Sequence, residues 1–125
     1  MTRILLIGYD PQAVDYSDPG LPPGLDVQKI TAGIELGLMQ IRDRGWDAEF
    51  CPILPDESAA TTVSKQLSSA SYDCVVIGGG VRGSSTGLTV FEAVINAVHE
   101  GAPSAAIAFN RLPDDTAEAA ARWIR

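Results

Sequence analysis

A glycine run followed by an arginine and hydroxyl side chains carries the clearest chemistry in this sequence. Residues 75–86 read VVIGGGVRGSST, so an apolar segment ends in three glycines, and Arg82, Ser84, Ser85 and Thr86 follow. Glycine leaves backbone N–H groups open to a ligand because it has no Cβ. A guanidinium binds carboxylate or phosphate, and a helix start behind the turn adds partial positive charge. We expect this turn to hold a small anionic or polar molecule; the alternative is a tight turn with no ligand.

Asp10 is the candidate for acid–base chemistry. It follows the first apolar run of the chain, and a carboxylate at the end of a strand can exchange a proton with a bound substrate. The alternative is that its side chain opens the next loop in an Asx-type turn with Pro11. A metal ion held by Asp10 with Asp15 or Asp18 is a further alternative. No cofactor and no metal are predicted, because no cluster of Cys and His has zinc-ligand spacing.

The remaining reactive side chains lie away from the glycine run. His99 falls near the end of a helix expected over 90–100, which places it about 15 Å from the glycines and excludes a Ser-His-Asp triad with Ser84 or Ser85. We expect a structural or interface role for it. Cys51 and Cys74 belong to strands that are not neighbours, about 9–10 Å apart, which is too far for a disulfide.

Strand and helix patterns alternate along the chain and must position these residues. This alternation predicts a parallel sheet with helices on both faces, in strand order 2-1-3-4. The expected architecture is a single-domain three-layer α/β sandwich, flavodoxin-like or Rossmann-like. Asp26 is expected to cap the first helix and Gly45 to end it, and Thr89 and Asp115 each precede a glutamate by three residues, a capping-box spacing. The expected strands are 3–8, 48–54, 74–77 and 105–109, and the expected helices are 26–44, 56 or 58–69, 90–100 and 117–124.

Two features of the chain predict how the site is enclosed. Residues 9–24 contain four prolines and form a long loop, which we expect to act as a lid. Gly33 and Gly37 lie one turn apart on the first helix, which predicts close packing, most simply against the sheet.

In such a sheet a ligand binds beyond the carboxyl ends of the strands, where the strand order reverses. The loops after strands one, three and four meet there, and the backbone N–H groups of Gly79, Gly80 and Val81 are expected to act as donors. No G-x-G-x-x-G follows the first strand and no P-loop is present, so a standard nucleotide site is not predicted. The expected lining residues are Tyr9, Gly79, Gly80, Val81, Arg82, Ser84, Ser85, Thr86 and Asn110.

Charge and hydropathy limit the classes of partner. The 125 residues have a net charge of −7, which argues against a nucleic-acid surface. No apolar stretch approaches the length of a membrane span and no signal peptide is visible, so a cytoplasmic protein is expected. The exposed fourth strand over 105–109 and the largely apolar helix over 90–100 predict a homodimer. An interaction module without activity is therefore the alternative to a ligand-binding protein, and a small enzyme using Asp10 is a second alternative.

Several segments resemble a family of small single-domain bacterial proteins of flavodoxin-like or Rossmann-like architecture, mostly uncharacterised. The similar segments are 72–82, 91–99 and 106–110, together with the loop 15–19. The resemblance implies the fold and a compact domain, and carries no activity with it. Members of that family have bulkier residues, often prolines, after the arginine, where this chain has Gly83, Ser84 and Ser85. We therefore expect a more open or more polar pocket here.

Overall fold

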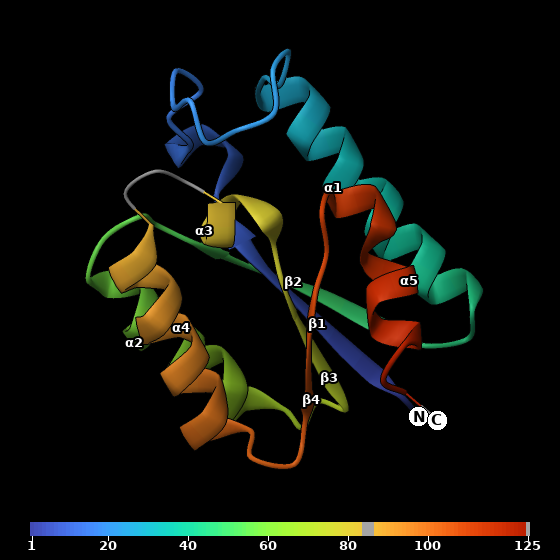
Figure 1. Cartoon of the computed structure of the whole chain (residues 1–125). Coiled ribbons are helices and arrows are strands. Elements are labelled where there is room, and N and C mark those ends of the chain that lie inside the picture. The colour runs from blue at the N-terminus through green and yellow to red at the C-terminus, as the bar shows by residue number, and fades with distance from the viewer. Residues whose placement is uncertain (84–86, 125) are drawn as a thin grey trace.

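The computed structural model describes residues 1–83 and 87–124, and these form a four-stranded parallel sheet between layers of helices (Figure 1). The strands are β1 (Arg3–Tyr9), β2 (Asp47–Ile53), β3 (Cys74–Ile77) and β4 (Ala106–Phe109). Their order is β2-β1-β3-β4 and every neighbouring pair is parallel. The predicted fold class and strand order are therefore confirmed.

Two pairs of helices cover the two faces of the sheet (Figure 1). Helices α1 (Val27–Asp43) and α5 (Thr116–Ala121) pack on one face, and α2 (Ser58–Ser69) and α4 (Leu88–Gly101) pack on the other. β1 lies between β2 and β3, and its buried residues alternate between two cores because successive side chains of a strand point to opposite faces. Both faces are covered, which explains why the strand reads as an unbroken apolar run.

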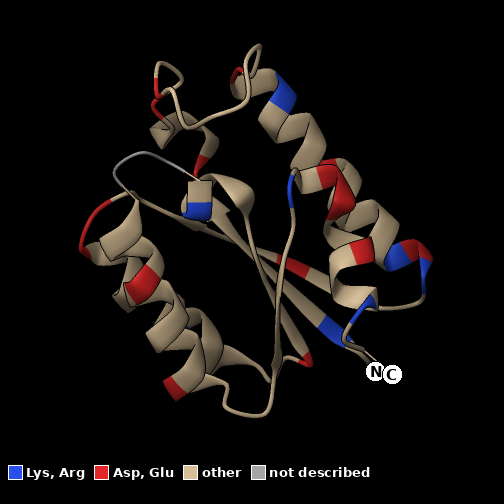
Figure 2. Ribbon diagram, viewed as in Figure 1, with Lys and Arg blue, Asp and Glu red and all other residues tan. Residues whose placement is uncertain are grey.

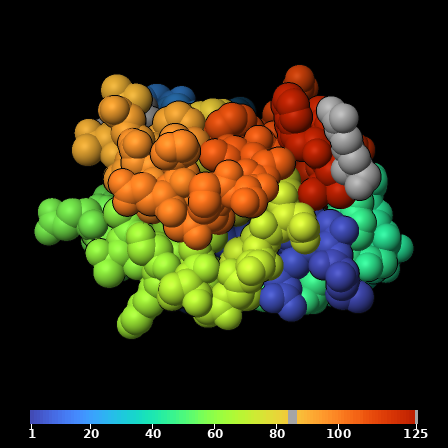
Figure 3. Space-filling model, turned by 90° about the horizontal axis from the view of Figure 1, so that it is seen from below, coloured from blue at the N-terminus to red at the C-terminus, as the bar shows by residue number. Residues whose placement is uncertain are grey.

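Three short elements lie at the carboxyl edge of the sheet. The 3₁₀ turn η1 (Pro11–Ala13) follows β1, the helical turn α3 (Gly79–Gly83) follows β3, and the 3₁₀ turn η2 (Pro113–Asp115) follows β4. The opposite edge is filled by the N-terminus and by the turns that precede β2, β3 and β4 (Figure 3). The loops that can enclose a ligand beyond the ends of the strands lie at the carboxyl edge.

The ends of the helices agree only in part with the sequence signals. Asp26 caps α1 by accepting the Lys29 N–H at 2.8 Å, and Gly45 follows α1 with φ +82°. The predicted capping box at Thr89 is wrong, because α4 begins at Leu88, one residue before it. Asp115 precedes α5, but its carboxylate accepts the backbone N–H groups of residues 111 and 112, so it closes the bend after β4 instead of capping the helix.

The glycine pair on α1 packs against η2, not against the sheet. The ring of Pro113 would contact a Cβ at Gly33 from 3.4 Å. At Gly37 a Cβ would lie closer than 3.0 Å to the Pro113 carbonyl oxygen, a separation that real Cβ atoms do not show. The close packing was predicted correctly and its partner was not, because the partner is distant in sequence.

The outer edge of β4 is short. The Ala106 N–H points inward to the Asp73 carbonyl of the segment before β3, so Ile107 and Phe109 direct their backbone groups outward. The Arg122 guanidinium donates to the Phe109 carbonyl at 2.9 Å and occupies part of this edge, a common way of protecting edge strands. The homodimer expected through this edge stays a prediction. Among the residues that the structure describes, no helix has the length and apolar character needed to cross a membrane.

The two cysteines predict how stability depends on alkaline pH. Burial raises the pKa of Cys51 and of Cys74 from 9.0 to about 11. Between pH 9 and pH 11 the unfolded chain therefore binds fewer protons than the folded chain, so the free energy of unfolding falls as the pH rises. Below pH 9 this contribution is fully present. Its loss amounts to roughly 2–3 kcal/mol per thiol by pH 11.

Urea unfolding at pH 8, 9.5 and 10.5 measures this loss. Cys51→Ala should show a shallower decline with pH than the wild type, because one of the two thiols no longer titrates. An equal decline in both proteins would contradict the assignment of the effect to the thiols.

Candidate functional site

A cavity of about 250 Å³ opens at the carboxyl edge of the sheet, where the strand order reverses between β1 and β3. The ends of three strands and the turns after them contribute to it: Gly8 and Tyr9 from β1, Gly78 after β3, and Asn110 after β4. We call it the switch-point cavity. It lies at the position that the strand order predicts for a ligand.

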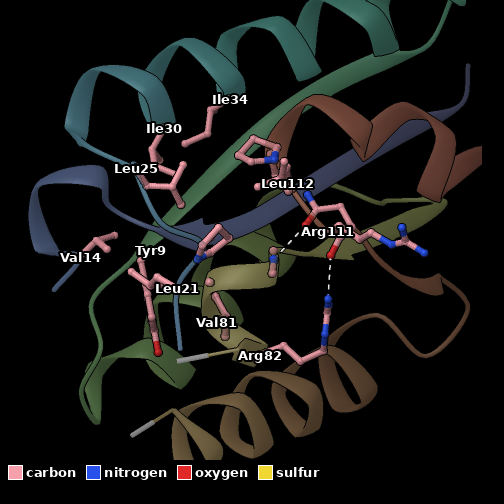
Figure 4. A pocket seen from close by; sticks show the side chains of 18 of the residues that line it. Tyr9, Val14, Leu21, Leu25, Ile30, Ile34, Val81, Arg82, Arg111 and Leu112 are labelled. Carbon is pink, nitrogen blue, oxygen red and sulfur yellow. Dashed lines mark hydrogen bonds between the residues drawn. The ribbon is translucent and has the colours of Figure 1, made fainter. Parts of the chain in front are cut away.

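The glycine run after β3 folds into α3 instead of an open turn (Figure 4). The Gly79 N–H donates to the Asn110 Oδ1 at 2.9 Å, and the Val81 N–H donates to the Gly78 carbonyl at 3.1 Å. Two of the three backbone donors expected for a ligand are therefore engaged within the protein. Among the described residues no group accepts the Gly80 N–H, which leaves it as the backbone donor of α3 that can face a ligand.

Asn110 is buried, and its side chain links α3 to the segment after β4, although it was expected to contact a ligand directly. Its Oδ1 accepts from Gly79, and its Nδ2 donates to the Thr116 Oγ1 at 2.9 Å. The Thr116 hydroxyl in turn donates to the Pro113 carbonyl at 2.6 Å. This chain of hydrogen bonds fixes α3 against the segment that follows β4. Asn110 lines the cavity, but its side chain mainly holds the cavity wall in place.

Arg82 lies at the rim of the cavity with its guanidinium held from one side. One of its terminal nitrogens donates to the Asn110 carbonyl at 2.9 Å, as Figure 4 shows, and the guanidinium lies 5.5 Å from the centroid of the Phe109 ring. A guanidinium has five N–H donors, so donors remain for a ligand. The ion pair found among the described residues joins Arg3 to Asp47, and no carboxylate of the described chain lies within 4 Å of the Arg82 guanidinium.

The opposite wall of the cavity is apolar. It combines Val14, Leu21 and Leu25 of the loop before α1 with Ile30 and Ile34 of α1 (Figure 4). The loop expected to act as a lid thus forms part of the enclosure. The sequence of the loop did not predict an apolar wall, because its aliphatic residues are isolated among prolines and aspartates.

Local hydrogen bonds shape that loop. The Tyr16 hydroxyl donates to the Pro11 carbonyl at 2.7 Å, and Asp18 accepts the Gly20 N–H at 2.7 Å. Asp15 accepts both the N–H and the hydroxyl of Ser17. These aspartates therefore have clear roles in the loop. No group of three potential metal-ligating side chains occurs in the described part of the chain.

Asp10 lies outside the switch-point cavity. Its carboxylate accepts the Gln12 N–H at 3.0 Å and caps η1, which is the Asx-type turn considered as the alternative to an acid–base role. It lines a shallower groove of about 480 Å³ beside α1, together with Glu35. Ile34 and Phe50 line both the switch-point cavity and this groove, and so separate the two. The acid–base role of Asp10 stays a prediction, and the geometry separates it from the glycine run.

The charged side chains of the cavity have one sign. Of the described residues that line it, Arg82 and Arg111 are charged and none is acidic. In Figure 2 the blue at α3 and after β4 marks these two arginines, while red occurs just after β1, on the helices and in the outer loops. Figure 4 shows both arginine side chains extending away from the apolar wall; that of Arg111 extends farther, and that of Arg82 ends at the Asn110 carbonyl, so Arg82 is the nearer cation. The predicted ligand residues Ser84, Ser85 and Thr86 lie outside the described residues.

The structure thus brings together Tyr9, the α3 backbone, Arg82 and Asn110, as expected, and adds an apolar wall that the sequence did not indicate. The resemblance to small bacterial α/β proteins stays a prediction. Comparison of the chain with models of known protein families, with curated proteins and with solved structures found no match.

Proposed function

We propose that this protein binds a small organic anion in the switch-point cavity, with Arg82 contacting the anionic group. The observation that carries the proposal is the sign of the charges around the cavity. The chain has 16 acidic and 9 basic residues, yet the charged residues among the described lining are both arginines. In a strongly acidic protein, this concentration of positive charge favours an anion at that one place.

The environment of Arg82 supports the same proposal. The carbonyl of Asn110 and the ring of Phe109 hold the guanidinium without neutralising its charge. A carboxylate or phosphate that reaches it would form charge-assisted hydrogen bonds, which are shorter and stronger than neutral ones. Gly80 belongs to the same helical turn, α3, as Arg82, and among the described residues no group accepts its N–H. The site therefore offers donors of the type and number that a small anion requires.

Titration of the labelled protein with octanoate and, separately, with glucose 6-phosphate tests the proposal. At least one of these anions should shift the backbone amide NMR signals of 79–82. Arg82→Met should weaken the binding of that anion about tenfold or more, because a charge-assisted hydrogen bond is lost.

Arg122→Met is the matched control. Arg122 also donates to a carbonyl of the β4 segment, that of Phe109, but it does not line the cavity. Its substitution should leave binding within about twofold of the wild type. Equal weakening by the two variants, or no response to either anion, would contradict the proposal.

A further inference from the structure

We infer that the anion is a monocarboxylate with an apolar body of about the size of octanoate, a conclusion that rests on the function proposed above and specifies its ligand. The site has two unlike sides, a cationic rim at Arg82 and an apolar wall formed by the loop and α1 (Figure 4). A molecule that matches both sides has one charged group and a hydrocarbon body.

The apolar wall consists of side chains that the protein itself leaves incompletely covered. Val14, Leu21, Leu25 and Ile30 are each partly exposed and all face the cavity. Covering them with a hydrocarbon chain removes apolar surface from water, which favours binding. A sugar or a nucleotide would instead place its hydroxyl groups against these side chains, where they lose hydrogen bonds to water and gain none.

The volume of the cavity limits the size of this body. About 250 Å³ corresponds to the liquid volume of about eight water molecules. It falls below the range of roughly 300–1,000 Å³ that is usual for pockets holding drug-sized ligands. A dinucleotide is therefore too large, and a single medium-length chain or one small ring with a carboxylate fits the space.

The charges outside the cavity fix the direction in which such a ligand lies. Arg82 and Ile34 stand on opposite sides of the cavity in Figure 4. Beyond Ile34 and Phe50, the groove beside α1 carries Asp10 and Glu35 and no cation among its described lining. A carboxylate is repelled from that side and attracted to the other. The carboxylate should therefore contact Arg82, and the hydrocarbon tail should point toward Ile34.

Calorimetry on the full chain with octanoate, octan-1-ol and glucose 6-phosphate tests this inference. The wild type should bind octanoate about tenfold or more tightly than either other compound. Arg82→Met should remove the advantage of octanoate over octan-1-ol. Leu21→Ser should weaken octanoate binding about fivefold, since apolar contact with the wall is lost. Leu36→Ser is the control, because Leu36 is an exposed leucine of α1 that does not line the cavity, and it should leave binding unchanged.

The possible outcomes separate this inference from the proposed function. Binding of glucose 6-phosphate that depends on Arg82 and exceeds that of octanoate would overturn the inference and leave the proposed function standing. Equal octanoate binding by Leu21→Ser and Leu36→Ser would also overturn the inference alone, because the hydrocarbon would not lie on this wall. Octan-1-ol binding as tightly as octanoate to the wild type would overturn the inference, and without Arg82-dependent binding of glucose 6-phosphate it would overturn the proposed function as well. No binding of either anion would overturn both.

Discussion

Replacing Gly37 with alanine is expected to destabilise the protein by roughly 3 kcal/mol, a large fraction of the stability of a domain of this size. The new Cβ would lie closer than 3.0 Å to the Pro113 carbonyl oxygen, which belongs to the backbone and cannot turn aside. Helix α1 and η2 would have to separate. Urea unfolding, monitored by circular dichroism, measures the change in the free energy of unfolding.

Gly33→Ala is the matched control on the same face of the same helix. Its Cβ would contact the Pro113 ring from 3.4 Å, which is an ordinary van der Waals distance. Alanine also favours a helix over glycine by up to about 1 kcal/mol. This variant should be as stable as the wild type or slightly more stable. Similar destabilisation by both substitutions would mean that the helix tolerates no side chain on this face, and that the contact with the Pro113 carbonyl is not the cause.

The contact at Gly37 matters to the cavity as well as to stability. Pro113 and Leu112 line the switch-point cavity from the segment after β4, and Ile30 and Ile34 line it from α1. The glycine contact joins the two elements that carry these walls. A substitution that breaks it should therefore also change the size of the cavity.

The sequence was sufficient to predict the sheet, because the information needed is local. β1, β3 and β4 are short apolar runs ended by glycine or polar residues, and β2 mixes apolar residues with Asp47, Glu49 and Pro52 before Pro55 ends the segment. The helices between consecutive strands have their own periodicity. Asp26 and Gly45 mark the ends of α1 through interactions with their own neighbours. The strand order then follows from right-handed connections together with one reversal of direction. The position of the cavity follows from that order alone.

The chemistry of the cavity could not be predicted in the same way, because it depends on contacts between distant segments. The Gly79 N–H meets the Asn110 Oδ1 across 31 residues, so a donor expected for a ligand is already used. The apolar wall arises because Leu21 and Leu25 of the loop line the same cavity as Ile30 and Ile34 of α1, and no spacing in the loop indicates this. Asp10, in contrast, makes a local contact. Its turn with Gln12 involves residues two apart, so it could be considered from the sequence, and it is present in the structure.

Replacing Gly79 with alanine is the second substitution with a large expected effect, and it acts on the cavity directly. The Cβ would lie closer than 3.0 Å to the Arg111 carbonyl oxygen. To relieve this overlap, α3 must move away from the segment after β4, and the hydrogen bond from the Gly79 N–H to Asn110 breaks. Overpacking together with a buried polar side chain that loses its partner should lower the free energy of unfolding by about 2–4 kcal/mol.

Gly80→Ala separates this steric effect from a general need for glycine in α3. Apart from its chain neighbours and the backbone of its own helix, no described atom lies within 4 Å of a Cβ at Gly80, and its φ is not in the left-handed region, so alanine fits both the space and the backbone. The stability of Gly80→Ala should stay within about 0.5 kcal/mol of the wild type. Arg82 belongs to α3, the same helical turn as Gly79. Gly79→Ala should therefore also displace the Arg82 guanidinium and weaken octanoate binding about tenfold. If Gly79→Ala were as stable as Gly80→Ala, α3 would not be held against Arg111 in solution, and the position of Arg82 at the rim would need another cause.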